Sequence, residues 1–75
     1  MATSLLHPAP VTVVSAEDAA PAQRRSAWTA WLHGRVAVVV DDEGPRLLVP
    51  MGTPTGAAVV LARRLYAVGS VELLD

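Results

Sequence analysis

Three carboxylates stand together at Asp41, Asp42 and Glu43, and oxygen ligands of this kind suit hard cations such as calcium. A calcium-binding loop places its acidic residues at alternate positions over about twelve residues and ends in Glu, and that spacing is absent around Asp41. The acids are followed directly by Gly44. We therefore predict a solvent-exposed turn in which Gly44 takes a positive φ, because a residue without a Cβ adopts that conformation at the lowest cost.

Glycines and hydroxyls also gather at 52–56, Gly-Thr-Pro-Thr-Gly, as they do in phosphate-binding loops. The Walker pattern needs a Lys before its Ser or Thr to reach the phosphates, and this chain contains no Lys. Thr53 before Pro54 is instead a good helix start, with Thr53 as the N-cap. We interpret the segment as a tight turn into a helix that runs to about Val68 and stops at Gly69.

Catalysis by a positioned base is not indicated. The two His residues, His7 and His33, lie on separate segments, and nothing nearby would orient either of them toward a nucleophile. The chain has no Cys, which excludes disulfides, thiolate metal sites and thiol chemistry. We therefore predict that the protein is not an enzyme and that it carries no cofactor or metal ion.

The composition is that of one small domain with an unusually apolar sequence. A chain of 75 residues buries only about 60% of its unfolded surface, so its stability is marginal without further help. Yet 52% of the residues are apolar, which indicates either a dense core rich in Ala and Val or an extra apolar surface that meets another chain. We favour the second interpretation.

Charge and hydropathy exclude several classes of protein. The six basic residues are all Arg and the net charge is −1, whereas a nucleic-acid-binding domain typically shows a basic stripe. No apolar stretch approaches the roughly 20 residues that a membrane span needs, and the first residues lack the basic start of a signal peptide. We expect a cytoplasmic protein without a membrane partner.

A β-hairpin over 35–50 positions the acidic turn. The β-branched run from Arg35 to Val40 suits a pleated strand, and the turn returns the chain into a second apolar strand. A three-residue loop that ends at Gly44 sets Val40 opposite Arg46, and cross-strand partners share a face. One predicted face carries Val36, Val38, Val40 and Leu48, and the other carries Ala37, Val39, Leu47 and Val49. Because both faces are apolar, we expect helices to cover one and another molecule to cover the other.

The rest of the domain surrounds this hairpin. We divide the chain into a Pro-punctuated arm at 1–10 and a single domain at 11–75. The apolar run at 11–14 predicts a short first strand. Residues 71–74 fit either a last strand or an irregular tail.

The first helix is expected to carry both tryptophans. Asp18 is its predicted N-cap, because a start at that residue places the following proline in the first turn, where a missing N–H is harmless. The helix then runs to about His33, and Gly34 stops it. Trp28 and Trp31 lie on one broad face, so we expect both rings to pack on the sheet rather than to bind a ligand.

One segment resembles part of a known family. Residues 44–65, GPRLLVPMGTPTGAAVVLARRL, are similar to the strand and first helix of PqqD-like peptide-recognition domains of ribosomal peptide biosynthesis, in which a short strand and a Pro-Thr-Gly-Ala turn lead into a helix. The likeness covers less than a third of the chain. The family continues with two further helices, whereas only ten residues follow Leu65 here, so we do not assign the chain to it.

The predicted order of elements is that of a small ferredoxin-like α+β sandwich, β-α-β-β-α-(β), with two helices on one face of an antiparallel sheet. In this arrangement the strand at 35–41 lies at a sheet edge. Natural edges are protected by Lys, Pro, a bulge or an inward charge, and this run of Val has none of them.

The sequence therefore predicts a non-catalytic interaction or assembly module that associates through the apolar hairpin and the open sheet face. The partner would be a second copy or a different protein, in a larger assembly or as the target of a small regulator. The alternative is a regulatory domain that binds a peptide, or that binds nucleic acid if the Arg pairs at 24–25 and 63–64 converge. The predicted interaction residues are Val36, Val38, Val40, Leu48, Arg63 and Arg64.

Overall fold

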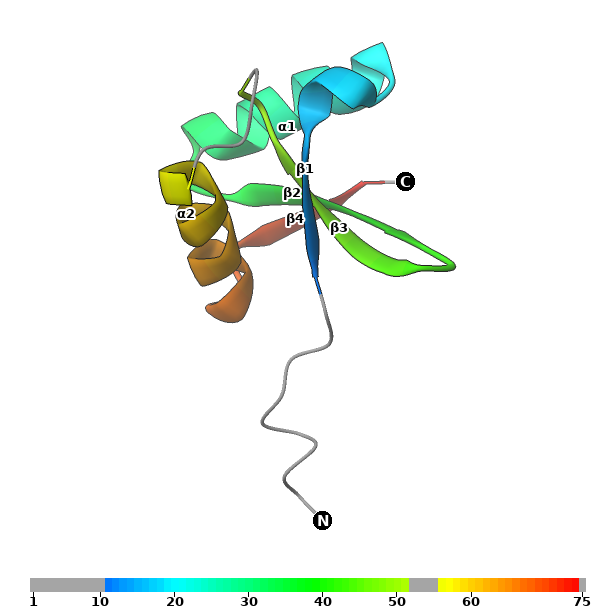
Figure 1. The fold of residues 1–75 in the computed structure, drawn as a ribbon. Helices are drawn as coiled ribbons and strands as arrows, with labels where there is room; N and C mark the ends of the chain where they lie inside the picture. Colours follow the sequence, from blue (N-terminus) through cyan, green and yellow to red (C-terminus); the bar gives the residue numbers. More distant parts are fainter. Residues whose placement is uncertain (1–10, 52–55, 75) are drawn as a thin grey trace.

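The computed structural model describes residues 11–51 and 56–74. In chain order its elements are β1 (Thr12–Ser15), the short 3₁₀ helix η2 (Ala16–Asp18), α1 (Pro21–Leu32), β2 (Val36–Asp41), β3 (Gly44–Val49), α2 (Gly56–Ala67) and β4 (Val71–Leu74) (Figure 1). The α+β class expected from the sequence is confirmed, and residues 71–74 form a strand. The arm at 1–10 and the helix start expected at Thr53 lie outside the described residues.

The four strands form one open, mixed sheet in the order β1-β3-β2-β4. β2 and β3 are antiparallel, whereas β1 runs parallel to β3 and β4 runs parallel to β2. The expected antiparallel sheet with β2 at its edge is therefore wrong. β4 pairs with the open side of β2, so the chain itself satisfies the backbone groups that would otherwise face solvent. The edge positions of the described sheet belong to β1 and β4.

The hairpin turn is tighter than expected. Asp41 pairs directly with Gly44, so only Asp42 and Glu43 connect the two strands. Gly44 has a φ of +104°, which confirms the left-handed residue that the turn requires. The register is nevertheless shifted by one residue from the expected one, because the loop contains two residues rather than three.

This shift changes the composition of the two sheet faces. Val38 pairs with Leu47, and Ala37 pairs with Leu48. Leu48 therefore lies on the opposite face from Val38, and the expectation that these two residues share a face is wrong. The reason is the two-residue period of a strand, in which a slip of one position exchanges the faces of every side chain.

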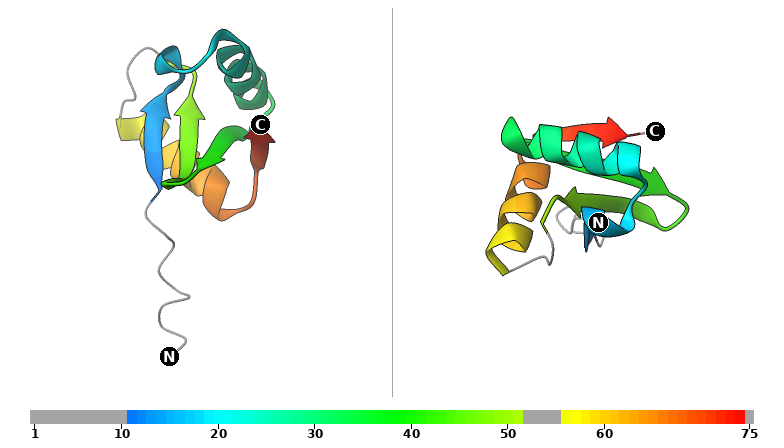
Figure 2. Two further views of the ribbon diagram at one scale, coloured as in Figure 1. Left: turned by 90° about the vertical axis from the view of Figure 1, so that its right-hand side faces the viewer. Right: turned by 90° about the horizontal axis from the view of Figure 1, so that it is seen from above.

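One helix covers each face of the sheet (Figure 2). Under α2, the sheet residues Val36, Val38, Leu47 and Val49 form a core with Ala58 and Ala62. Under α1, the sheet residues Ala37 and Leu48 form a second core with Ala16, Ala27 and Ala30. The expectation of two helices on one face is therefore wrong. Both faces of the hairpin are apolar, and the chain covers both with its own Ala-rich helix surfaces.

The start of α1 also differs from the expected one. Ser15 caps η2 by accepting a hydrogen bond at its hydroxyl from the backbone N–H of Glu17 at 3.2 Å, and Asp18 belongs to η2 rather than capping α1. Ala20 is extended, as a residue before proline tends to be, so α1 can begin only at Pro21. Ala20 offers no side-chain cap, and Pro21 has no N–H that needs one.

Both helices end with the same arrangement of hydrogen bonds. In α1, the N–H of Gly34 donates to the Trp31 carbonyl at 3.0 Å, and the N–H of the next residue donates to the Ala30 carbonyl at 2.8 Å. In α2, the N–H of Gly69 donates to the Tyr66 carbonyl at 3.1 Å, and the N–H of Ser70 donates to the Leu65 carbonyl at 2.8 Å. The predicted stops at the two glycines are confirmed, and each leads straight into a strand.

Candidate interaction surface

Trp28 lies on the outer side of α1 and leaves 52% of its surface exposed. The helix meets the sheet through Ala27 and Ala30, both fully buried, and this orientation turns Trp28 outward. Trp31 lies on the inner side and packs against the core under α2. The expectation that both rings cover the sheet therefore holds for Trp31 and is wrong for Trp28. The small alanines, not the large rings, set the distance between α1 and the sheet.

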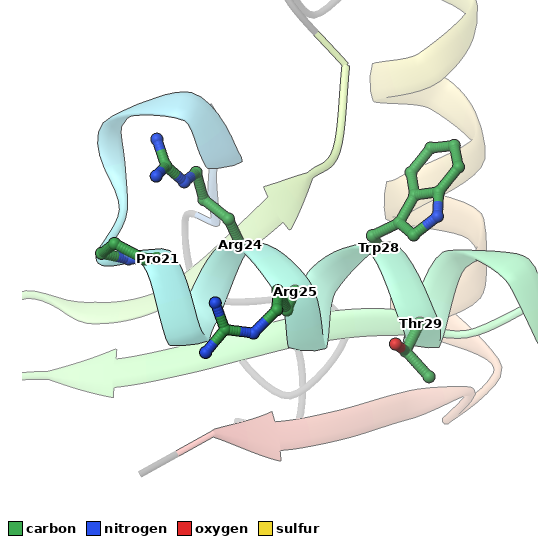
Figure 3. Close-up of a pocket in the computed structure, with 5 residues that line it drawn as sticks. All are labelled: Pro21, Arg24, Arg25, Trp28 and Thr29. Atoms are coloured by element: carbon green, nitrogen blue, oxygen red, sulfur yellow. The ribbon is translucent and has the colours of Figure 1, made fainter.

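Two open hollows meet at the Trp28 ring. One hollow belongs to α1 and is lined by Pro21, Arg24, Arg25, Trp28 and Thr29 (Figure 3). The other joins α1 to the segments beside it and is lined by Ala16, Glu17, Arg24, Trp28, Pro50 and Met51. We call Arg24, Arg25, Trp28, Pro50 and Met51 the Trp28 surface. It combines an exposed aromatic ring and a methionine with two cations.

The two cations of this surface are not used by the fold. Arg24 precedes Trp28 by four residues, which places both on one side of α1, and in Figure 3 the guanidinium points away from the ring. Neither the Arg24 nor the Arg25 side chain has an ion-pair or hydrogen-bond partner among residues 11–51 and 56–74. Arg and Trp are the side chains that most often dominate binding energy at protein interfaces.

Two other arginines bond to the starts of the edge strands. Arg35 donates from Nη2 to the carbonyl of Val71 at 2.6 Å, at the first residue of β4. Arg63 donates from Nη2 to the carbonyl of Val11 at 3.3 Å, just before β1. Each edge strand has four residues and an arginine bonded at its start. Short length and a nearby charge both protect an edge from pairing with another chain.

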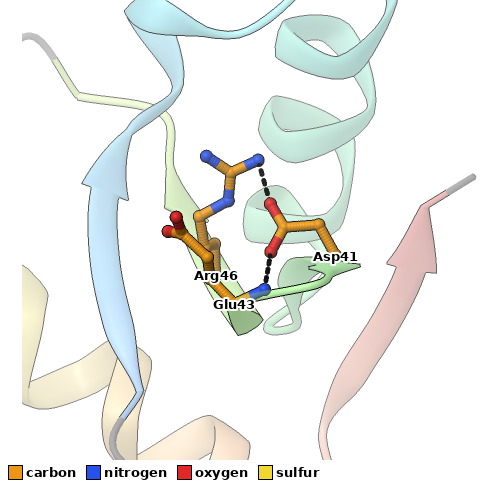
Figure 4. Close-up of polar contacts among 3 residues, drawn as sticks. All are labelled: Asp41, Glu43 and Arg46. Carbon is orange, nitrogen blue, oxygen red and sulfur yellow. Dashed lines mark hydrogen bonds and ion pairs between the residues drawn. The ribbon is translucent and has the colours of Figure 1, made fainter.

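The hairpin end is held in one shape by its own polar contacts. Asp41 accepts a hydrogen bond at Oδ1 from the backbone N–H of Glu43 at 2.9 Å, and its Oδ2 lies 2.7 Å from Nη2 of Arg46 (Figure 4). Asp42 and Glu43 are exposed, and neither carboxylate has a partner among the described residues. The turn therefore presents two unpaired negative charges on a fixed support.

Apolar side chains lie beside these charges. Val40 immediately precedes the acids and is 61% exposed, while Leu73 on β4 is 69% exposed. Leu73 pairs with Val38, so Leu73 and Val40 are diagonal neighbours on the face that α2 covers only in part. We call Val40, Asp42, Glu43 and Leu73 the hairpin end. It combines an exposed apolar pair with two anions.

A third apolar region lies on α2 and at the residue just after it. Val60, Leu61 and Val68 are 43–68% exposed, because the helix meets the sheet through Ala58 and Ala62 instead. The helical spacing of the bulkier residues would turn Leu61 and Val68 toward the sheet, and the structure leaves both exposed. Alanines again make the closest contact with the sheet, which rotates the helix relative to the stripe inferred from the bulkier residues.

The predicted interaction residues fall into three groups in the structure. Val36, Val38 and Leu48 are buried in the two cores, so they are structural residues. Val40 is exposed at the hairpin end, as expected for a contact residue. Arg63 bonds to the carbonyl beside β1, and Arg64 is exposed on α2.

The two Arg pairs do not share a surface. Residues 24–25 lie on α1 and residues 63–64 lie on α2, and these helices cover opposite faces of the sheet. Nucleic-acid binding was proposed as an alternative only if these two Arg pairs converge, and in this arrangement they do not. Sequence reasoning also missed Met51 and Leu73 as exposed positions. The available signal was weak: Met51 lies between Pro and Gly, and Leu73 follows Glu72 in a short apolar segment.

Within residues 11–51 and 56–74, no group of three or more His, Cys, Asp or Glu side chains is arranged to hold a metal ion. None of the polar or charged residues that the structure describes is buried. Among those same residues, no helix has the length and apolar character that crossing a membrane requires.

Comparison with known proteins does not place the chain in a family. No family model, no curated protein and no solved structure matches it. The segment at 44–65 that resembles PqqD-like domains continues here into the strand β4 rather than into two further helices.

Proposed function

We propose that the protein is a non-catalytic interaction module that assembles through its hairpin end. The observation that carries this proposal is the uncovered apolar corner of the sheet at Val40 and Leu73, which are 61% and 69% exposed. Scattered exposed apolar residues are normal on any protein, but these two are diagonal neighbours on paired strands. Burying the exposed part of each side chain in a contact would contribute about 1–2 kcal/mol to the free energy of association.

The sheet edges are poor sites for pairing with another chain, which favours the hairpin end as the contact surface. β2 is paired on both sides, and the two edge strands are short and carry an arginine bond at their start. Association by adding a strand to the sheet is therefore disfavoured. Association by covering an exposed apolar corner needs no change in the strands, and its partner is a second copy or a different protein.

The test is light scattering on the purified full chain over a hundredfold range of concentration, with two matched variants. Val40→Asp places a charge in the proposed contact, and Val60→Asp places the same charge at a similarly exposed valine on α2. We expect the wild type and Val60→Asp to associate as concentration rises and Val40→Asp to remain monomeric.

Two results count against the proposal. If Val60→Asp abolishes association and Val40→Asp does not, the contact surface is the outer side of α2. If the wild type stays monomeric over the whole range and captures no protein partner, the chain is not an interaction module of this kind. Both substitutions are at exposed positions, so we expect each variant to keep the fold. Circular dichroism of each variant checks this.

A further inference from the structure

We infer that the hairpin end of one copy docks on the Trp28 surface of a second copy. This inference rests on the proposed function and adds the identity of the partner and its docking site. The two surfaces are complementary in charge. The Trp28 surface has two arginines whose side chains have no partner among residues 11–51 and 56–74, against the single carboxylate of Glu17 in the same hollow. The hairpin end has two carboxylates without a partner among those residues. Each also has an apolar centre, which is Trp28 with Met51 on one surface and Val40 with Leu73 on the other.

The spacing of charge and apolar group is similar on the two surfaces. Arg24 and Trp28 are four residues apart on a helix, which corresponds to about 6 Å along its axis. Val40 lies near the end of β2 and Asp42 is in the turn, so their Cα atoms are at most about 6–7 Å apart, the length of two residues of extended chain. A valine placed against the Trp28 ring would therefore bring a carboxylate within reach of Arg24.

Both surfaces are fixed before they meet. The hairpin turn is held by the Asp41–Arg46 ion pair and by the hydrogen bond from Glu43 to Asp41. Trp28 projects from a regular helix that is packed on the sheet through Ala27 and Ala30. Little conformational freedom is lost when pre-organised surfaces bind, so a small contact can still give measurable affinity.

The contact must join different copies in a head-to-tail manner. Within one chain, no ion pair links the two surfaces among residues 11–51 and 56–74. The surface that docks and the surface that receives it are different. Two copies can therefore make both contacts reciprocally in a closed dimer, or the contacts continue from copy to copy into a larger ring or an open chain.

Other surfaces carry no such argument. The outer side of α2 is apolar, but nothing in the structure indicates what would cover Val60, Leu61 and Val68. The hollow beside Arg46 has its cation already paired with Asp41. The Trp28 surface is the one among the described regions where an apolar centre and unpaired charges both find a counterpart on the same chain.

The experiment mixes two variants that each lack one surface. The first variant, Arg24→Gln/Arg25→Gln/Trp28→Ala, removes the receiving surface and leaves the hairpin end intact. We expect it to be monomeric in sedimentation velocity at concentrations where the wild type associates. Truncating a Trp at the centre of an interface typically weakens binding by more than about tenfold.

The second variant, Val40→Thr/Asp42→Asn/Glu43→Gln, removes the docking surface and leaves the Trp28 surface intact. It too should be monomeric alone. An equimolar mixture of the two variants has one working contact per pair, so we expect a 1:1 dimer and nothing larger. A control variant, Val60→Thr/Arg64→Gln, changes one apolar and one cationic residue on α2 and should associate like the wild type.

Each alternative gives a different result. An interface between two Trp28 surfaces would leave the second variant able to self-associate, and an interface between two hairpin ends would leave the first variant able to do so. Either result overturns the head-to-tail contact while the proposed function survives. A mixture that remains monomeric when the wild type associates also overturns it. A wild type that never associates, with or without a foreign partner, removes the proposed function as well.

Salt provides an independent measurement on the wild type. Contacts between exposed charges weaken as salt rises, whereas apolar contacts do not. We expect the dissociation constant of the wild type to increase severalfold between low and high salt. The dissociation constant of Asp42→Asn/Glu43→Gln should already be higher than that of the wild type at low salt, and it should change little as salt is added. A wild-type constant that is insensitive to salt would contradict a contact between the arginines and the acidic turn.

Discussion

Replacing the two tryptophans separately by alanine tests how α1 is oriented on the sheet. The chain has two Trp residues, three positions apart on one helix, and the structure gives them opposite roles. Trp31 packs against the core under α2, whereas Trp28 is 52% exposed. The substitution is chemically the same at both sites, so each variant is the matched control of the other.

The expected costs follow from burial. Trp→Ala in a core costs about 3–5 kcal/mol, and we expect about 3 kcal/mol for Trp31 because it is only partly buried. A buried aromatic ring removes roughly 150–250 Å² from water, so about 100 Å² is buried at the half-exposed Trp28, corresponding to about 2 kcal/mol as an upper value. Alanine still buries part of that area and has a higher helix propensity than tryptophan, so the expected loss in the free energy of unfolding for Trp28→Ala is about 1 kcal/mol.

The difference is large on the scale of this domain. At about 0.05–0.15 kcal/mol per residue, the total stability of a chain of 75 residues is roughly 4–11 kcal/mol. The Trp31→Ala variant should therefore melt about 8–16 °C below Trp28→Ala, since about 1 kcal/mol shifts the midpoint of a small domain by about 4–8 °C. Urea and thermal unfolding followed by far-ultraviolet circular dichroism measure both, at dilutions where association does not contribute. Equal losses at the two sites would refute the orientation of α1 described above.

Three further tests address the packing and the turn. Gly44→Ala should cost about 1 kcal/mol or more in urea unfolding because φ at this residue is +104°, whereas Gly56→Ala, where φ is not positive and no atom lies within 4 Å of an added Cβ, should be neutral or stabilising. Ala30→Leu should lower the free energy of unfolding by roughly 1–3 kcal/mol, because this alanine is fully buried between α1 and the sheet. A double-mutant cycle at Asp41 and Arg46, whose side chains are 36% and 45% exposed, should give a coupling energy of about 0.2–1 kcal/mol that decreases as salt is added.

The elements of this fold could be predicted from local sequence, and their arrangement could not. The β-branched run before Asp41 and the glycine after the acids identify a hairpin, and Gly34 and Gly69 mark the ends of both helices. The placement of β4 depends on which strand has an open edge with an apolar row to extend. That is a property of the assembled sheet and leaves no mark at 71–74 itself.

The orientation of the helices was hidden by the use of alanine. Amphipathic patterns are normally inferred from large residues, which here would turn Trp28 and Leu61 toward the sheet. The structure buries Ala27, Ala30 and Ala62 instead and leaves both larger residues exposed. Each helix meets the valines and leucines of the sheet through alanines, and the small alanine side chain lets the helix backbone approach the sheet closely.

The candidate site was predicted only in part for the same reason. Val40 is exposed at the hairpin end, but a shift of one residue in the turn moved Leu48 to the other face. The length of a turn decides the composition of both faces, and Asp-Asp-Glu-Gly is compatible with loops of two or three residues. The Trp28 surface needed the tertiary structure, since Met51 and Arg24 are far apart in the chain.

The measurement that tests the association most directly is a dilution series of the uniformly ¹⁵N-labelled wild type, followed at the indole N–H signals of its two tryptophans. One signal comes from the proposed contact at Trp28, and the other comes from Trp31 in the core and serves as an internal control. The account predicts that the Trp28 signal shifts and broadens as concentration rises while the Trp31 signal stays in place. Two signals that remain unchanged over a hundredfold range of concentration would contradict it, as would a shift confined to Trp31.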